Sequence, residues 1–278
     1  MLAGKSITTV IPEFKIVCTW LFNKGFIRIE YLIYESKLTI SSGYRADNHS
    51  SSDSKIAPIF SDISLDFVIN EVLPRVAEEK LAQFCDIFCE KDVFSIAQSR
   101  RLLTAAKKLG LKIKLHADEI VQTGGAELAA DLKAVSADHL LQASDEGIRK
   151  MARAGVVATL LPATAFSLKE PYARGRYIID NNGAVALATD YNPGSCFTES
   201  IPLIFSLATL YMGLTTEEAV SALTINAAAA LDKADSIGSI DPGKQADLVV
   251  FSDIKKPVIE PVFQFIYQQP SGGPLLNI

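Results

Sequence analysis

Lys114-Leu115-His116-Ala117-Asp118-Glu119, the stretch KLHADE, decides the fold. Residues 111–115 alternate apolar and basic side chains as a short strand does, and the alternation then breaks into a histidine and two carboxylates. An imidazole that can bind a metal and a carboxylate that can carry a proton are therefore expected where a strand ends. In parallel α/β folds, the loops at these strand ends present the reactive side chains.

The same arrangement repeats along the chain. The expected strands end near Glu90, His116, His139, Leu161 and Asp190, at intervals of 26, 23, 22 and 29 residues. Units of β-strand and α-helix at nearly constant length predict a (β/α)8 barrel or a doubly wound open sheet, and both place strand-end side chains on one rim. A full barrel takes ~250 residues. Five units are clear, so the first three strands come from the N-terminal third or are missing.

Three segments are expected on this pattern. Residues 1–57 are a divergent segment with β-rich pieces and a Ser-rich loop, and residues 58–232 are the (β/α) barrel domain. Residues 233–278 are β appendage strands and a tail, because a short strand, a Pro-Gly turn and a buried strand succeed one another there. Helices are expected over residues 66–81, 95–109, 126–132, 144–154, 172–181, 201–212, 215–223 and 227–231, with Pro74 opposing one unbroken helix in the first.

Composition narrows the class of protein. Of 278 residues, 49% are hydrophobic and 21% are charged, which is too apolar for disorder and ordinary for an enzyme. The net charge of −5, without a basic stripe, argues against a nucleic-acid partner. Charges interrupt the most apolar stretch, residues 16–40, so no membrane span is expected. Residues 1–15 do not resemble a signal peptide and only four cysteines are present, so we expect buried thiols in a cytoplasmic protein.

Four strand-end side chains can do chemistry together. His116 and His139 offer imidazoles and Asp190 offers a carboxylate, which suit a hydrolytic metal such as Zn²⁺. Such a metal lowers the pKa of bound water to near 7, which leaves Glu119 for proton transfer. The competing interpretation for each residue is structural: a hydrogen-bonded histidine, or an aspartate that caps a helix.

The residues after Asp190 form a second candidate feature. Asn192, Gly194 and Ser195 could offer backbone N–H groups and a hydroxyl to an anionic substrate group. A plain Asn-Pro-Gly turn is the alternative.

Longer motifs add a resemblance. FCEK (88–91), QSRR (98–101), KLHADE (114–119), GGAELAADLKAVSADH (124–139), SDEGI (144–148), LLPAT (160–164), ALATDYNPGS (186–195), TINAAAAL (224–231) and GKQADLVVF (243–251) are similar to the imidazolonepropionase family of metal-dependent amidohydrolases. The similarity covers roughly residues 60–253. It implies a distorted (β/α)8 barrel with a β-sandwich built from both chain ends. It also implies one Zn or Fe ion and hydrolytic opening of the ring of 4-imidazolone-5-propanoate to N-formimidoyl-L-glutamate, in histidine degradation.

The resemblance implies residue roles. His116 and Asp190 match metal ligands, Glu119 matches a residue that binds substrate and carries protons, and His139 matches a histidine that assists the water. Three residues match contacts to the propionate side of the substrate: Asn192, Gly194 and Ser195. Tyr44 lies in a SGY sequence similar to the family's SGYG, whose tyrosine binds substrate, although Arg45 replaces the second glycine.

One departure from the family pattern leaves several hypotheses about the activity of the chain open. The family's first strand supplies two ligands from His-x-His, and this sequence has three histidines and no His-x-His. His116 and Asp190 are fewer than the three ligands usual for catalytic zinc, and His139 could be a third. The chain is therefore an active hydrolase, a truncated or rearranged inactive relative, or, as a third hypothesis, an unrelated doubly wound α/β binding protein. An incomplete barrel exposes sheet edges, which predicts a homodimer or a poorly soluble monomer.

Overall fold

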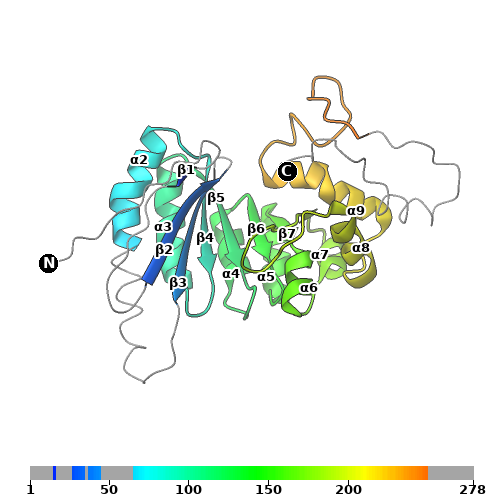
Figure 1. The fold of residues 1–278 in the computed structure, drawn as a ribbon, viewed down its shortest axis with the longest axis horizontal. Coiled ribbons are helices and arrows are strands. Elements are labelled where there is room, and N and C mark those ends of the chain that lie inside the picture. The colour runs from blue at the N-terminus through cyan, green and yellow to red at the C-terminus, as the bar shows by residue number, and fades with distance from the viewer. Residues whose placement is uncertain (1–14, 17–26, 35–36, 45–64, 250–278) are drawn as a thin grey trace, which may run out of the picture.

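The computed structural model describes residues 15–16, 27–34, 37–44 and 65–249. They contain one sheet, whose strand order follows the chain from β1 to β8 (Figure 1). The strands are β1 (Lys15–Ile16), β2 (Ile27–Tyr34), β3 (Lys37–Tyr44), β4 (Phe84–Cys89), β5 (Lys112–Ala117), β6 (Ser136–His139), β7 (Val157–Leu160) and β8 (Val185–Leu187).

The pairing of the strands changes from antiparallel to parallel at β3. β3 to β8 run parallel, whereas β1 and β2 add antiparallel pairs at the N-terminal edge. β3 therefore takes the place beside β4 that a barrel strand would take, but it follows β2 directly, without a crossover helix. The architecture is the predicted α/β fold as an incomplete barrel, and the N-terminal third supplies a hairpin in place of the first units.

The five strands predicted from the repeated pattern are all present. The ends of β4 to β7 lie within one residue of the predicted strand ends, whereas β8 ends at Leu187, three residues before Asp190. Parallel strands covered on both faces read as short apolar runs, which is why the pattern located them.

Helices follow the strands in alternation. They are α2 (Leu73–Glu78), α3 (Ile96–Lys108), α4 (Gly125–Leu132), α5 (Asp145–Ala154), α6 (Pro162–Leu168), α7 (Gly175–Asp180), α8 (Ile201–Tyr211), α9 (Thr216–Leu223) and α10 (Ile225–Ala230). Side-chain caps define the N-termini of several helices. Ser95 and Gln98 form a capping box at α3, Thr215 and Glu218 form the predicted one at α9, and the Ser144 hydroxyl accepts the Gly147 N–H at α5. None of the helices in the described part of the chain is long and apolar enough to cross a bilayer.

The helix expected over residues 66–81 forms over residues 65–78 and contains a π-helical turn ahead of the proline. A π-helical turn (Val68–Val72) precedes α2, in which Pro74 occupies the first turn. Proline lacks the N–H that an α-helix would bond four residues back. The wider π-helical turn therefore ends two residues before Pro74, which cannot donate a backbone hydrogen bond to the helix.

The expected β appendage is not formed by the residues described in that region. Over residues 233–249 the chain makes turns, including a hydrogen bond of 3.2 Å from the Lys244 N–H to the Asp241 carbonyl, and contains no strand. Ile240, Leu248 and Val249 are exposed there. The Pro-Gly turn was thus predicted correctly, but the strand expected to follow it is wrong as far as residue 249. Residues 250–278 lie outside the described part.

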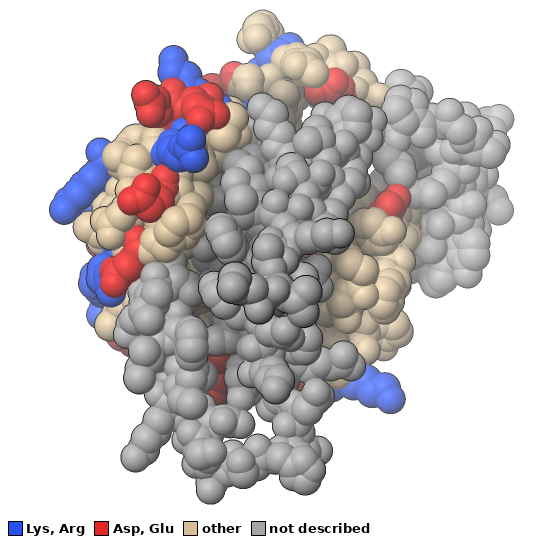
Figure 2. All heavy atoms as spheres, turned by 60° about the vertical axis from the view of Figure 1, so that its left-hand side comes forward, with Lys and Arg blue, Asp and Glu red and all other residues tan. Residues whose placement is uncertain are grey.

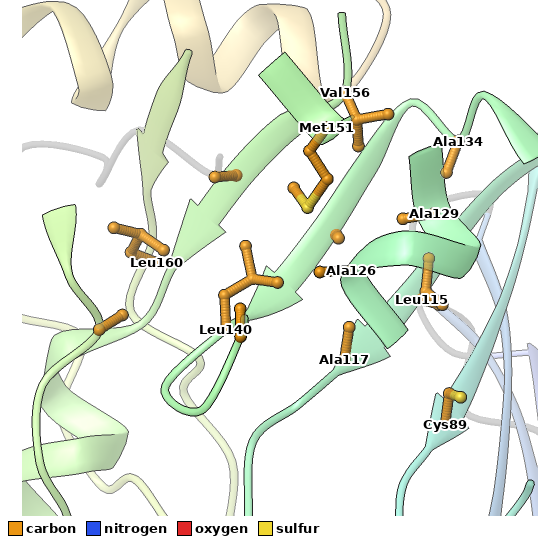
Figure 3. Close-up of a cluster of buried hydrophobic side chains, with 14 of the residues drawn as sticks. Cys89, Leu115, Ala117, Ala126, Ala129, Ala134, Leu140, Met151, Val156 and Leu160 are labelled. Atoms are coloured by element: carbon orange, nitrogen blue, oxygen red, sulfur yellow. The ribbon is translucent and has the colours of Figure 1, made fainter. Parts of the chain in front are cut away.

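One face of the sheet packs against α3, α4 and α5. Figure 3 shows Ala126 and Ala129 of α4 beside Leu115 and Ala117 of β5, with Cys89 of β4 nearby. The contact is close because the helix begins with a glycine: a Cβ added at Gly125 would lie 2.8 Å from the Ala117 Cβ. Because the residues at this contact are small, α4 packs close to β5, next to the loop that carries Asp118 and Glu119.

The opposite face is polar near the middle strands and apolar toward β8. Val157 and Ala186 pack there against Ala227 and Ala230 of α10, the helix that covers this side. At the far edge, the Asn226 side-chain amide donates to the Val185 carbonyl of β8 at 2.8 Å. The last strand of the open sheet is thus buried beneath the C-terminal helices.

The outer surface carries mixed charge. Figure 2 shows Lys and Arg side chains interspersed with Asp and Glu side chains among the described residues of one face. Arg100 pairs with Asp131 at 2.8 Å, and Arg101 pairs with Asp66. Exposed pairs of this kind contribute about 0–1 kcal/mol each, so they add little to stability. Cys85 and Cys89 are buried as predicted, and Cys196 is buried as well, whereas Cys18 lies outside the described residues.

Candidate active site

The site lies where β4, β5 and β6 end. His116 of β5 pairs in register with Asp138 of β6, and the next pair is Ala117 with His139. Side chains alternate between faces along a strand, so His116 and Asp138 share the face that α10 covers farther along. The register therefore brings the two predicted histidines to adjacent positions on neighbouring strands.

His116 has a carboxylate on either side. Its Nδ1 lies 3.0 Å from Oδ2 of Asp86, which is fully buried in β4. Candidate ligand atoms of Asp86, His116 and Asp138 all lie within 4.8 Å of one another. Donors bound to one zinc ion are roughly 3–4 Å apart, given bonds of about 2.0–2.2 Å. The three side chains therefore fit a divalent cation after a small closure.

Lys114 lies against this carboxylate group. Its Nζ is 3.8 Å from Oδ1 of Asp138 and donates to the Ala230 carbonyl at 3.3 Å. The Ser136 hydroxyl also donates to Asp138, at 2.9 Å. The Lys114 ammonium and the Ser136 hydroxyl already balance part of the charge of Asp138. They would therefore compete with a metal cation for this carboxylate.

Glu119 and His139, the two residues predicted to carry protons, lie against each other. His139 Nδ1 lies 3.4 Å from Glu119 Oε1, and the His139 ring centroid is 5.1 Å from that of His116. Burial is the largest cause that raises the pKa of Glu119 to about 7; His116 lowers that pKa, and Asp190 raises it. A carboxyl with a pKa near 7 can both accept and release a proton at neutral pH.

Asp190 acts on the same carboxyl from the segment after β8. It follows β8, and its Oδ2 accepts a hydrogen bond of 2.7 Å from the Thr164 hydroxyl. Its charge acts on Glu119, as does that of His116. His116, His139 and Asp190 thus all interact with Glu119, so the four predicted chemical residues meet at this carboxyl.

The turn after Asp190 is closed by its own side chains. Oδ1 of Asn192 accepts the N–H groups of Gly194 and Ser195, both at 2.8 Å, and Nδ2 donates to the Asp190 carbonyl at 2.7 Å. The two amides expected to point at an anionic group are therefore used within the turn. The Ser195 hydroxyl accepts from Nδ2 at 3.0 Å.

Strained backbone marks three of the strand ends. Asp118, His139 and Asp190 have φ of 50°, 76° and 54°, in the left-handed region that side chains other than glycine seldom adopt. Such conformations cost about 1–3 kcal/mol each and cluster at functional sites. The surrounding hydrogen bonds hold these residues where the local backbone preference would not.

Sequence reasoning missed Asp86, Asp138 and Glu90 as site residues. A signal was available, because Asp86 is the one charged residue in the otherwise apolar run of β4 and Asp138 directly precedes His139. Tyr44 ends β3, but its side chain lies outside what the structure describes.

Comparison with known proteins agrees with this geometry. A model of the amidohydrolase family matches residues 75–262. Two curated proteins named imidazolonepropionase are similar over the same region. The one from Clostridium tetani (strain Massachusetts / E88) is 67% identical over 186 residues, which are 67% of this chain and 44% of that protein. The one from Bacteroides fragilis (strain YCH46) is 69% identical over 189 residues, or 68% and 45%.

Solved structures share the fold at low identity. A zinc-bound adenosine deaminase from Xanthomonas campestris superposes with a TM-score of 0.60 at 20% identity, over 84% of this chain and 57% of that one. A triazine hydrolase variant superposes with a TM-score of 0.59 at 15% identity, over 73% and 51%. This chain spans somewhat less than half the length of the curated relatives it matches.

Proposed function

This chain belongs to the amidohydrolase family, and from that premise we propose that it hydrolyses 4-imidazolone-5-propanoate to N-formimidoyl-L-glutamate. One observation carries the proposal. Glu119, with a pKa near 7, lies 3.4 Å from His139 and interacts with His116 and Asp190. Ring opening needs a group that takes a proton from water and returns it to a leaving nitrogen, and Glu119 is suited to both steps.

The residues of the chain divide the reaction between them. Glu119 accepts the proton as the water oxygen adds to the ring carbonyl carbon, and it donates that proton to the nitrogen as the carbon–nitrogen bond breaks. His139 holds the water and the Glu119 carboxyl in line. Asn192, Gly194 and Ser195 form the wall that faces the propionate side of the substrate. Tyr44 is proposed as a further substrate contact.

A Zn or Fe ion is the proposed cofactor. When bound, such an ion supplies a water of lowered pKa. Two candidate ligand sets share His116. The family resemblance adds Asp190, whereas the geometry adds Asp86 and Asp138. Lys114 weighs against the second set, because a cation at Asp138 would meet the ammonium 3.8 Å from its carboxylate. We therefore propose His116 with Asp190 as ligands and Asp86 as the group that orients the His116 ring.

Metal content of variants distinguishes these sets. Asp190→Ala should reduce bound metal, measured by elemental mass spectrometry, to a small fraction of the wild-type amount, and Asp138→Asn should retain it. The opposite result would transfer the site to Asp86 and Asp138.

Activity tests the function itself. Glu119→Gln should lower kcat for ring opening by a factor of about 10²–10⁴ and leave bound metal unchanged. Glu79→Gln, the same substitution at an exposed position beyond α2, is the matched control and should behave as wild type. Metal-loaded wild type that does not turn over 4-imidazolone-5-propanoate would refute the proposal and favour the inactive relative, for which the missing His-x-His is the reason. The expected dimer stays a prediction, to be tested by light scattering.

A further inference from the structure

Glu90 makes contacts that the reaction does not use directly. It follows β4 and is 2% exposed. Its Oε2 accepts the backbone N–H groups of Glu119 at 3.0 Å and Ile120 at 2.9 Å, and its Oε1 accepts that of Val121 at 3.3 Å. Three consecutive amides after β5 thus converge on one buried carboxylate of the neighbouring strand.

A second carboxylate holds the remainder of the same loop. Asp118, fully buried, accepts the N–H groups of residues 123 to 126 at 2.7–3.1 Å. The loop from β5 to α4 is therefore held in two separate halves. Glu90 holds the half that contains Glu119, and Asp118 holds the half that begins the helix.

The central residue of the half held by Glu90 adds little side-chain burial. Ile120, in the middle of the three amides, is 63% exposed. Hydrogen bonds to an ionised acceptor are about twice as strong as neutral ones. The backbone at Glu119 therefore depends on the Glu90 carboxylate more than on packing of its neighbour.

We infer that Glu90 is a positioning residue, which fixes the backbone of Glu119 and so sets the 3.4 Å approach of its carboxyl to His139. The catalytic consequence rests on the proposed function, whereas the structural half of the inference does not. A displacement of about 1 Å at a reacting group can lower a rate by a factor of about 100, so a residue that touches no substrate can still govern kcat.

Amide hydrogen exchange tests the structural half, residue by residue. In the wild type, the amides of residues 119–121 should be protected although they lie in a loop. In Glu90→Gln, their protection should fall about 10-fold or more, since one charged acceptor is replaced by a neutral one with a donor at its other atom. The amides of residues 123–126, held by Asp118, should not change. Glu79→Gln is the matched control.

Turnover per bound metal tests the catalytic half. Glu90→Gln should lower kcat per bound metal by a factor of about 10–100. A purely structural role would lower the amount of folded protein and leave kcat per bound metal at the wild-type value, which would overturn the positioning role.

Unchanged exchange at residues 119–121, or equal loss in both halves of the loop, would overturn the inference as well. If the wild type does not hydrolyse the substrate, the hydrogen-exchange pattern alone decides whether Glu90 positions the loop. Failure of the proposed function is therefore distinguishable from failure of this inference. If Glu90→Gln does not fold, fast wild-type exchange at residues 119–121 would still contradict it.

Discussion

Replacing Asp118 by asparagine should destabilise the protein more than any conservative surface change. The aspartate is fully buried. Its Oδ1 accepts four hydrogen bonds, from the Thr123 N–H and hydroxyl and from the N–H groups of Gly124 and Gly125. Its Oδ2 accepts the Ala126 N–H at 2.9 Å. This carboxylate therefore satisfies the free amides at the start of α4 and meets the positive end of the helix dipole.

The magnitude follows from these five bonds. In the better orientation of Asp118→Asn, the amide oxygen keeps four bonds, each weaker by about 1 kcal/mol because the charge is gone. The NH2 group then faces the Ala126 N–H, and this buried donor loses its acceptor at a cost of about 1–3 kcal/mol. Since neighbouring contributions do not add fully, we expect a loss of about 3–5 kcal/mol.

Urea denaturation followed by circular dichroism measures this loss. Asp131→Asn is the matched control, because it makes the same chemical change in α4 at an exposed residue that pairs with Arg100. The control should lose less than about 1 kcal/mol. A loss below about 1 kcal/mol in Asp118→Asn, equal to that of the control, would refute the argument that this carboxylate anchors the loop.

Two further predictions concern the same region. In metal-free protein, the folded-state pKa of Glu119 is raised from 4.5 to about 7, so the native state binds more protons and the unfolding free energy falls as pH rises from 4.5 to about 7. This fall in the unfolding free energy is about 3 kcal/mol at most. Glu119→Gln should remove the fall when urea denaturation is repeated across that pH range. An unchanged pH dependence in the variant would show that Glu119 is not the titrating group. Gly125→Ala should destabilise by about 1–3 kcal/mol through overpacking, because its Cβ would lie 2.8 Å from the Ala117 Cβ and 3.0 Å from its Cα. A higher melting temperature, as helix propensity alone would give, would mean that α4 moves away from β5 at little cost.

The parallel strands and their helices were predictable because short apolar or alternating runs recur at nearly constant spacing between helical segments. The sequence places His116, His139 and Asp190 at strand ends on that ground alone, and β5, β6 and the segment after β8 carry them as expected. The N-terminal hairpin could not be assigned to a sheet edge, since a period of two identifies a strand without identifying its neighbour.

Other features depend on contacts that a linear pattern does not contain. Asp86 and Asp138 become site residues through the register of three strands, and Glu90 through amides roughly 30 residues farther along. Up to residue 249, the strand expected after the Pro-Gly turn is not formed, because apolar residues there were taken as buried, whereas Leu248 and Val249 are exposed.

The strand order has a consequence for how the chain can fold. Every described strand pairs with the strand before it in sequence, so no pairing joins the two ends of the sheet. Short loop closures cost less entropy than long ones, and folds dominated by local contacts fold faster. A closed barrel must wait for its last strand to meet its first. This sheet can instead grow one strand at a time in the order of synthesis, and among the described helices α10 would dock last, over Val157 and Ala186.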